Sequence, residues 1–523
     1  MMKSCAKIMD IFSVLPESRR VLWAVVALVI LLCAVANLPW HLDNYDQAKQ
    51  AYVSYEIATG GDPWFQHTPR GGVATKPPLA GWISLGLYRA IGNWDVAWRL
   101  PGFLSALVLL ALLMREGHRL LPGAGPVLAA GAFGLNLLTP RLATLVRTDM
   151  MLTLWITLCG LLILRVVRRG DGWMRGERIA FMGVMAAALF TKGPILYAFL
   201  LPGMLAFAFL APRGRRHLVW SGWWTWVLPL ALFLAWGIVG LMTRQSFYDE
   251  VVVREFLSRF NQDLRGSERR QPIWFYFPHL LHKFLPWSLL LIGLPVFYPK
   301  AREAIRENPA LLWLACWGLG GLILMTFIPS KRVDRIFPII PPLSLLLIGM
   351  VAACWSNRKI LDVLAALAAL VAPLLRKPWE PAERYNYNNP PKIRGILGVA
   401  LLAAALFSGG YFFGVVALGF HDGNDRLARF GRGAARMAQQ SGKHSLGLVS
   451  SSDEGLLLYF GAPKPLHTAE AMNLWNDHEI DALLIPDRKF RELPESQTTQ
   501  FPRPALISEE TQNKNRHLLF LRP

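Results

Sequence analysis

Residues 21–39 read VLWAVVALVILLCAVANLP, an apolar run that contains no charged side chain. About 18 to 20 such residues are enough for a helix to cross the hydrocarbon core of a bilayer. Comparable runs recur along the chain, at residues 218–242 and 396–420 among others. Backbone groups in lipid must be hydrogen-bonded internally, so each run predicts a helix. The sequence therefore predicts a mainly α, polytopic membrane protein with about 11–13 transmembrane helices.

The composition supports this class. The chain has 523 residues, of which 53% are hydrophobic and only 17% charged, and this is too apolar for an ordinary soluble enzyme. The formal net charge is +20, but the basic residues cluster in short loops between the apolar runs, as the positive-inside rule describes. We therefore expect membrane lipids and not nucleic acid as partners. The five cysteines show no spacing typical of a metal site or a disulfide framework, which predicts packing roles.

The charge pattern also predicts the topology. Basic residues before residue 21 indicate a retained signal anchor with a cytoplasmic N-terminus, which places the polar segment 41–78 outside. A helix over residues 79–91 is too short to cross and should lie along the membrane interface. Alternating spans then bring the polar stretches around Asp149, Lys192 and Lys331 to the same external side. The expected spans include residues 93–114, 123–140, 150–164 and 278–297.

The C-terminal part has the composition of a small soluble domain. We expect a transmembrane domain over residues 1–420 and an α/β domain over residues 421–523, with strands at 445–450, 481–485 and 517–521 and a helix at 453–460. The run 361–375 has basic residues at both ends, so either it does not span or it forms a hairpin. The C-terminal domain is then periplasmic, whereas a full crossing would put it on the other side.

Two carboxylates are the candidates for catalysis. Asp46 lies a few residues beyond the first span, where a carboxylate can accept a proton near the membrane surface. Its alternative roles are a solvated loop acid or a helix N-cap. Asp149 lies between Arg147 and an apolar run, and capping the following helix would also explain it.

Cations at the external ends of spans are candidates for binding an anion. Lys76 precedes Pro77 and Pro78, which favour a helix start where backbone amides can meet a phosphate. Lys192-Gly193-Pro194 repeats this arrangement. The alternatives are lysines that extend toward the interface and arginines that attract anionic headgroups. The candidate substrate-binding residues are Lys76, Lys192, Arg259, Lys331, Arg332, Arg335, Asp43 and Glu255.

Five motifs together resemble a known family. They are Asp46-Gln47 through Gly61-Asp62-Pro63-Trp64 to Lys76-Pro77-Pro78, Arg147-Thr148-Asp149, Thr191-Lys192-Gly193-Pro194, Glu255-Phe256 with Leu285-Pro286-Trp287, and Lys331 with Phe337-Pro338. In order and spacing they resemble the GT-C superfamily, in the group of bacterial aminoarabinose transferases and protein O-mannosyltransferases.

The resemblance implies an inverting glycosyltransferase of the bacterial inner membrane with an active site that faces the periplasm. The donor would be a sugar on a polyprenyl (undecaprenyl) phosphate, and the acceptor a lipid, a glycan or a protein. By analogy, Asp46 would be the catalytic acid or base and Asp149 a second active-site carboxylate. Lys76 and Arg259 would bind the donor phosphate.

The sequence departs from this group at three positions. Relatives of the aminoarabinose type often carry an acidic residue before Lys-Pro-Pro and a histidine after the glutamate of the fourth motif, where this chain has Thr75 and Phe256. Gln47 also replaces the common glutamate. A divalent metal therefore stays an open alternative. The alternative function is a transporter or flippase of lipid-linked saccharides, but transporters place their ionisable groups near the midplane.

Overall fold

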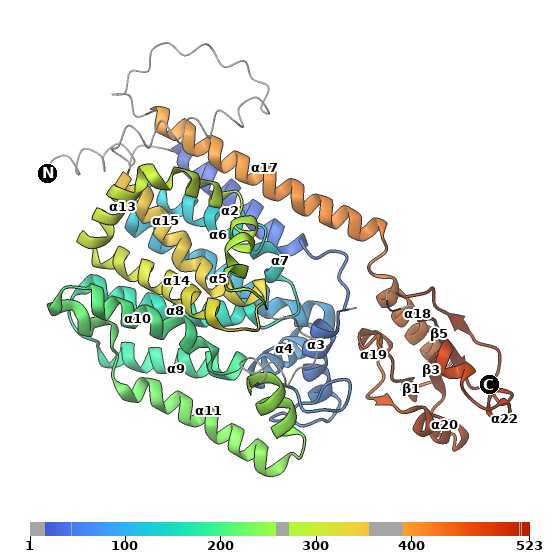
Figure 1. Cartoon of the computed structure of the whole chain (residues 1–523). Helices are drawn as coiled ribbons and strands as arrows, with labels where there is room; N and C mark the ends of the chain where they lie inside the picture. The colour runs from blue at the N-terminus through green and yellow to red at the C-terminus, as the bar shows by residue number, and fades with distance from the viewer. Residues whose placement is uncertain (1–15, 43, 258–270, 355–390, 512, 514) are drawn as a thin grey trace, which may run out of the picture.

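The computed structural model describes residues 16–42, 44–257, 271–354, 391–511, 513 and 515–523. Its larger part is a bundle of long apolar helices, and a small mixed domain follows it (Figure 1). Seven helical stretches in the described part are long and apolar enough to span a membrane: Trp94–Leu120, Asp149–Arg169, Arg175–Leu210, Arg213–Thr243, Pro309–Phe327, Val333–Ala353 and Ala400–His421. The chain is a polytopic helical membrane protein, as predicted. The total of about 11–13 spans stays a prediction.

The first and the last helix of the bundle in sequence order pack together. α2 (Pro16–Val35) lies beside the long α17 (Pro391–His421), although hundreds of residues separate them in the sequence (Figure 1). The ambiguous run 361–375 lies outside the described residues. The side of the membrane on which the C-terminal domain lies therefore stays a prediction.

The short helix before the first long span of the described part has the bounds that the sequence predicts. α4 spans Leu79–Ile91 and ends at Gly92, whose φ of 73° is the left-handed conformation that glycine adopts without strain. α5 (Trp94–Leu120) begins after Asn93, whose side chain accepts a hydrogen bond from the Val96 amide at 3.2 Å. Gly92 and Asn93 thus form the turn that joins α4 to α5.

The span expected over residues 123–140 is wrong as a continuous helix. The chain forms α6 (Gly125–Gly134) and a separate short α7 (Thr139–Ala143). The buried Asn136 lies in the break, where its amide nitrogen donates to the carbonyls of Ala132 and Phe133 and its oxygen accepts from the Leu138 and Thr139 amides. One side chain thus satisfies the backbone groups that the break leaves unpaired.

The span expected over residues 278–297 is also wrong as a continuous helix. This region comprises α12 (Tyr276–Lys283), the 3₁₀ turn η7 (Trp287–Gly293) and α13 (Leu294–Glu307). Pro286 has no amide hydrogen to continue the hydrogen bonds of α12, which explains the interruption. Before this region, residues Tyr248–Phe256 form the π-helical segment η3.

The remaining long helices follow one another in the expected order along the chain. α8 covers Asp149–Arg169, α9 covers Arg175–Lys192, α10 covers Leu196–Leu210 and α11 covers Trp223–Thr243. α14 (Pro309–Phe327) and α15 (Ile340–Cys354) follow, joined by the 3₁₀ segment η8 (Val333–Ile339). α10 and α14 approach closely at Gly203 and Gly320. A Cβ added at Gly320 would lie only 2.6 Å from the Gly203 nitrogen, so this contact needs glycine.

The C-terminal region contains a five-stranded sheet in the order β2-β1-β3-β5-β4. β1 (Leu446–Val449) pairs in parallel with β2 (Pro465–Leu466) and β3 (Ala482–Pro486), and β5 (His517–Leu521) pairs antiparallel with β3 and β4 (Leu506–Ile507). The helices are α18 (Arg426–Gln440), α19 (Gly455–Phe460), α20 (Thr468–Asn476), α21 (Asp487–Arg491) and α22 (Glu495–Thr498). The expected α/β structure and its expected strands are present.

This small domain packs on α3 (Tyr45–Ala58), the helix that follows the first span. Ala48, Ala51 and Tyr52 share one buried apolar cluster with residues of α18, α19 and the sheet. The Tyr55 hydroxyl donates to the Ala462 carbonyl at 3.2 Å. Arg70 also forms an ion pair of 2.6 Å with Glu454. The domain therefore fixes α3 and the loop after it.

Candidate functional site

α3 presents Asp46 at its first turn. Asn44 is the N-cap, because its side chain accepts from the Asp46 amide at 2.9 Å, so the interpretation of Asp46 as the cap is wrong. The Asp46 carboxylate instead binds Arg332 at 2.9 Å and Arg147 at 3.2 Å, and 43% of the side chain is exposed. It is neither an isolated loop acid nor a closed ion pair, since it stays accessible from one side.

The charges around Asp46 keep it ionised. Burial alone would raise the pKa of this carboxyl group, but the hydrogen bond and the charge of Arg332, together with Arg147 and Lys76, hold the pKa below its ordinary value. Asp46 is therefore a carboxylate at neutral pH and can accept a proton.

Arg147 connects Asp46 to Asp334 in the segment η8. Its guanidinium binds Asp46 on one side and Asp334 at 2.5 Å on the other. Arg332 also approaches Asp334, at 3.8 Å. These pairs join the start of α3, the segment before α8 and the loop before α15.

Asp149 and Lys192 form a buried ion pair close to this junction. Asp149 begins α8 and Lys192 ends α9, and their charged atoms are 2.5 Å apart with each side chain only 9% exposed. Thr148 occupies the N-cap position. A carboxylate at a helix start and a cation at a helix end are each favourable with the helix dipoles.

Lys76 brings in the segment before α4. It forms an ion pair with Glu255 of η3, and its positive charge contributes to the lowered pKa of Asp46. Asp149 begins α8, Lys192 ends α9 and Lys76 precedes α4, and the charge of Lys76 acts on both Asp46 and Asp149.

Two of the predicted cations bind loop atoms. Lys331 donates to the Gln271 carbonyl at 3.2 Å, and Arg335 donates to the carbonyl and the hydroxyl of Ser330 at 2.6 and 2.8 Å. These contacts stabilise the loop that presents Arg332. Asp43 and Arg259, which the sequence also suggests, lie outside the described residues.

The choice of candidates from sequence missed three charged residues of the cluster. Arg147 and Asp334 belong to quoted stretches of sequence, but no local pattern shows that they meet. Lys49 could have been found, because it follows Asp46 by three residues and such residues share a helix face. Its Nζ donates to the Thr75 hydroxyl at 3.2 Å.

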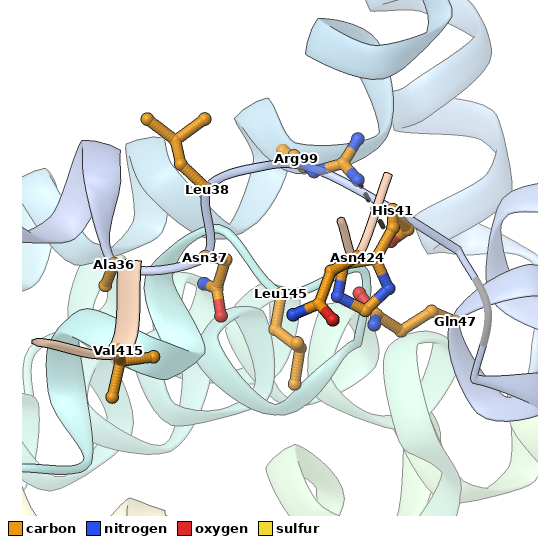
Figure 2. Close-up of a pocket in the computed structure, with 9 residues that line it drawn as sticks. All are labelled: Ala36, Asn37, Leu38, His41, Gln47, Arg99, Leu145, Val415 and Asn424. Carbon is orange, nitrogen blue, oxygen red and sulfur yellow. Dashed lines mark hydrogen bonds between the residues drawn. The ribbon is translucent and has the colours of Figure 1, made fainter. Parts of the chain in front are cut away.

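A small polar cavity lies near α3, at the junction of α2, α5 and the chain after α17 (Figure 2). Asn37, His41, Gln47, Arg99 and Asn424 contribute its polar lining, and its volume is about 100 Å³. Ligand pockets are usually larger, roughly 300 Å³ or more. The Gln47 oxygen accepts from the Val146 amide at 3.2 Å, which aligns α3 with the segment that carries Arg147. The cavity therefore belongs to the support of the site.

The arrangement can bind an anion and accept a proton at one place. The described residues contain no group of three or more His, Cys, Asp or Glu side chains that could hold a metal ion. His67, a histidine in the loop after α3, binds Glu56 at 2.6 Å.

Comparisons with known proteins show which family and which fold the chain resembles. The family described as "Dolichyl-phosphate-mannose-protein mannosyltransferase" matches residues 75–238. The chain is 25% identical over 395 residues to the "Undecaprenyl phosphate-alpha-4-amino-4-deoxy-L-arabinose arabinosyl transferase" of Pectobacterium atrosepticum, covering 73% of this chain and 64% of that protein. It is 27% identical over 380 residues to a relative of the same name from Sodalis glossinidius, covering 69% and 65%. The chain thus spans slightly less than two thirds of these relatives.

A solved structure shares the fold. The crystal structure of ArnT from Cupriavidus metallidurans bound to undecaprenyl phosphate superposes with a TM-score of 0.63 at 20% identity, covering 95% of this chain and 97% of that one. The expected GT-C fold and the family resemblance are confirmed.

Proposed function

We propose that this chain belongs to the aminoarabinose transferase-like group of the GT-C superfamily and is a glycosyltransferase of the bacterial inner membrane. It transfers one sugar from a polyprenyl phosphate carrier, such as undecaprenyl phosphate, to an acceptor hydroxyl. The names of the relatives and the undecaprenyl phosphate in the similar structure support this donor class.

One observation carries the proposal. Asp46, Arg147, Arg332 and Lys76 come from four separate segments and gather at one end of the bundle, next to the buried pair of Asp149 and Lys192. A transferase that acts on a lipid-linked donor needs a base and fixed cations close together at one end of its helices. A transporter would place its charges near the midplane.

The residues divide the reaction between them. Asp46 accepts the proton of the acceptor hydroxyl as the oxygen attacks C1 of the sugar. The bond between C1 and the phosphate oxygen breaks, and its electron pair stays on the phosphate. Lys76, with Arg332 and Arg147 nearby, stabilises the negative charge that develops there. A single displacement of this kind inverts the anomeric carbon.

Asp149 and Lys192 act as the second carboxylate and cation of the site. The pair is buried, so it holds the start of α8 against the end of α9 beside the reacting groups. Lys331 and Arg335 have a positioning role, since they stabilise the loop of Arg332.

We also propose the orientation and the domain roles. Residues 1–420 form the transmembrane domain and residues 421–523 a periplasmic domain, with the active site on the periplasmic side. The apolar contact between the C-terminal domain and α3 supports this arrangement, because both then lie on the same side of the membrane. The acceptor is a lipid, a glycan or a protein.

The test uses purified protein and a synthetic undecaprenyl phosphate sugar. The wild-type protein should release undecaprenyl phosphate and form an inverted product with an acceptor extract from the cell envelope. A protein that moves the donor across vesicles without releasing carrier phosphate would instead be a flippase, and the proposal would be wrong. Mass spectrometry of envelope lipids and glycans from a deletion strain identifies the sugar and the acceptor.

A further inference from the structure

Lys49 is a half-buried cation within the proposed site. It lies three residues after Asp46 on α3, so the two side chains leave the same face of the helix. Its Nζ donates to the Thr75 hydroxyl at 3.2 Å, and Thr75 directly precedes Lys76. Lys49 therefore reaches from the helix of the proposed base to the segment of the proposed phosphate ligand.

The Lys49 ammonium has unused binding capacity. It carries three donors, and its one hydrogen bond within the described part of the chain goes to Thr75. No described carboxylate lies within 4.0 Å of its Nζ. Burial lowers the pKa of Lys49, while the charges of Glu255 and Glu250 act in the opposite direction. An anion that enters the site would meet a partly desolvated cation with free donors.

The same neighbourhood does not fit a divalent metal. The Thr75 hydroxyl accepts from Lys49, and Glu255 binds Lys76. Both oxygens of Glu250 accept from Arg254, at 3.0 and 3.0 Å. Each of these three side chains is thus already bound to a cation. A dication would also be repelled by the positive charges beside it.

We infer that Lys49 is a fixed cation of the donor site, which binds the carrier phosphate together with Lys76 and takes the place of a divalent metal ion. This inference rests on the proposed function. The phosphate gains negative charge as its bond to C1 breaks, and an ammonium held in place by the fold stabilises that charge without prior metal binding. Donor binding and transfer should therefore be independent of divalent cations.

The first test measures binding of undecaprenyl phosphate to wild-type protein after treatment with EDTA and after addition of Mg²⁺, Mn²⁺ or Zn²⁺. Elemental analysis determines the metal content of the same samples. We expect the midpoint of binding to change less than two-fold across all conditions. A ten-fold loss of binding with EDTA that Mg²⁺, Mn²⁺ or Zn²⁺ restores would overturn the inference.

The second test uses variants with the same ligand, and undecaprenol as the ligand without phosphate. Lys49→Met should weaken binding of undecaprenyl phosphate about ten- to hundred-fold, as expected for loss of a charge-assisted hydrogen bond, and leave undecaprenol binding unchanged. Lys49→Arg should keep binding within about three-fold. Thr75→Val removes the hydrogen bond but keeps the charge, and its effect should be below two-fold.

Lys300→Met is the matched control, because Lys300 pairs with Glu303 on α13, where both side chains are exposed. Thermal unfolding shows whether each variant is folded. A folded Lys49→Met protein that binds undecaprenyl phosphate like the wild type would refute the inference about Lys49 and leave the proposed function unaffected. Wild-type protein that binds no undecaprenyl phosphate in any condition would refute the proposed function as well.

Discussion

The two ends of the helical bundle both contain dense groups of carboxylates and arginines, but these groups are built differently. At the end opposite the proposed site, Glu116 of α5 binds Arg119 and Arg168, and Glu177 of α9 binds both terminal nitrogens of Arg169 at 2.7 and 2.9 Å. Both carboxylates are less than 10% exposed. They are closed pairs, made by neighbours in the sequence or on adjacent helices.

At the site end, the partners come from distant segments and the carboxylate stays accessible. Arg147 and Asp334 are 187 residues apart, and Arg332 and Asp46 are 286 residues apart. Asp46 is 43% exposed. A buried cluster whose carboxylates are all paired stabilises the packing of the helices. An accessible carboxylate surrounded by cations can instead exchange these partners for a substrate. We therefore expect substitutions at the opposite end to reduce stability and substitutions at the site end to reduce turnover.

The largest effect is expected for Asp46→Asn. Loss of a general base should lower turnover roughly 10²- to 10⁴-fold, while thermal unfolding stays near that of the wild type because the side chain is partly exposed. Release of undecaprenyl phosphate measures the turnover. The lowered pKa of Asp46 keeps this carboxylate ionised. The loss of wild-type turnover at acid pH should therefore occur below pH 3.8, the ordinary pKa of an aspartic acid side chain. An active Asp46→Asn enzyme would remove the base from the mechanism.

The pair of Asp149 and Lys192 should affect both properties. Asp149→Asn leaves a buried ammonium without its partner, which costs about 3–5 kcal/mol of unfolding free energy. The double variant Asp149→Asn with Lys192→Met should recover most of that stability but not the turnover. Denaturant unfolding in detergent and the release assay measure the two quantities. Recovered turnover in the double variant would show that the pair is only structural.

Glu116→Gln tests the other end. Removal of this carboxylate leaves Arg168 without its ion-pair partner, and we expect a loss of about 1–3 kcal/mol of stability. Turnover per folded molecule should equal that of the wild type. A large fall in turnover with unchanged stability would contradict the distinction between the two ends.

Sequence reasoning predicted more of the helices than of the site. Apolar runs identify spans because lipid permits few backbone conformations, and the bounds of α4 follow directly from its length and flanking residues. The prediction of one continuous helix over residues 123–140 was wrong because the helix breaks at Asn136. The side chain of this buried residue hydrogen-bonds the backbone groups at the break, and hydropathy does not reveal this. Pro286 interrupted the run 278–297 in a similar way.

The candidate site was found through motifs at the ends of spans, which brought Asp46, Asp149, Lys76 and Lys192 to one side. The pairings within it were not predictable. Which carboxylate Arg147 would bind depends on contacts between segments more than one hundred residues apart. Lys331 and Arg335 look like Arg332 in the sequence, yet their contacts are with loop atoms.

The smallest effect is expected from pH, in the loop that connects α3 to Lys76. The hydrogen bond that the His67 ring donates to Glu56 raises the pKa of His67, against the opposing effect of burial. A raised pKa in the folded state means that this ion pair contributes fully below about pH 6.5, the ordinary value, and that its contribution is lost as pH rises through the folded value. The amides of residues 61–73 should therefore be less protected at high pH.

Hydrogen exchange, corrected for intrinsic rates, measures this loss between pH 6 and pH 9. His67→Gln should abolish the pH dependence and resemble the high-pH wild type at both values. His421→Gln is the control, because His421 is an exposed residue at the end of α17 and bonds only Asp422 among the described residues. Protection that is equal at both pH values in the wild type would show that apolar contacts such as Phe65 with Trp236 hold this loop without the ion pair.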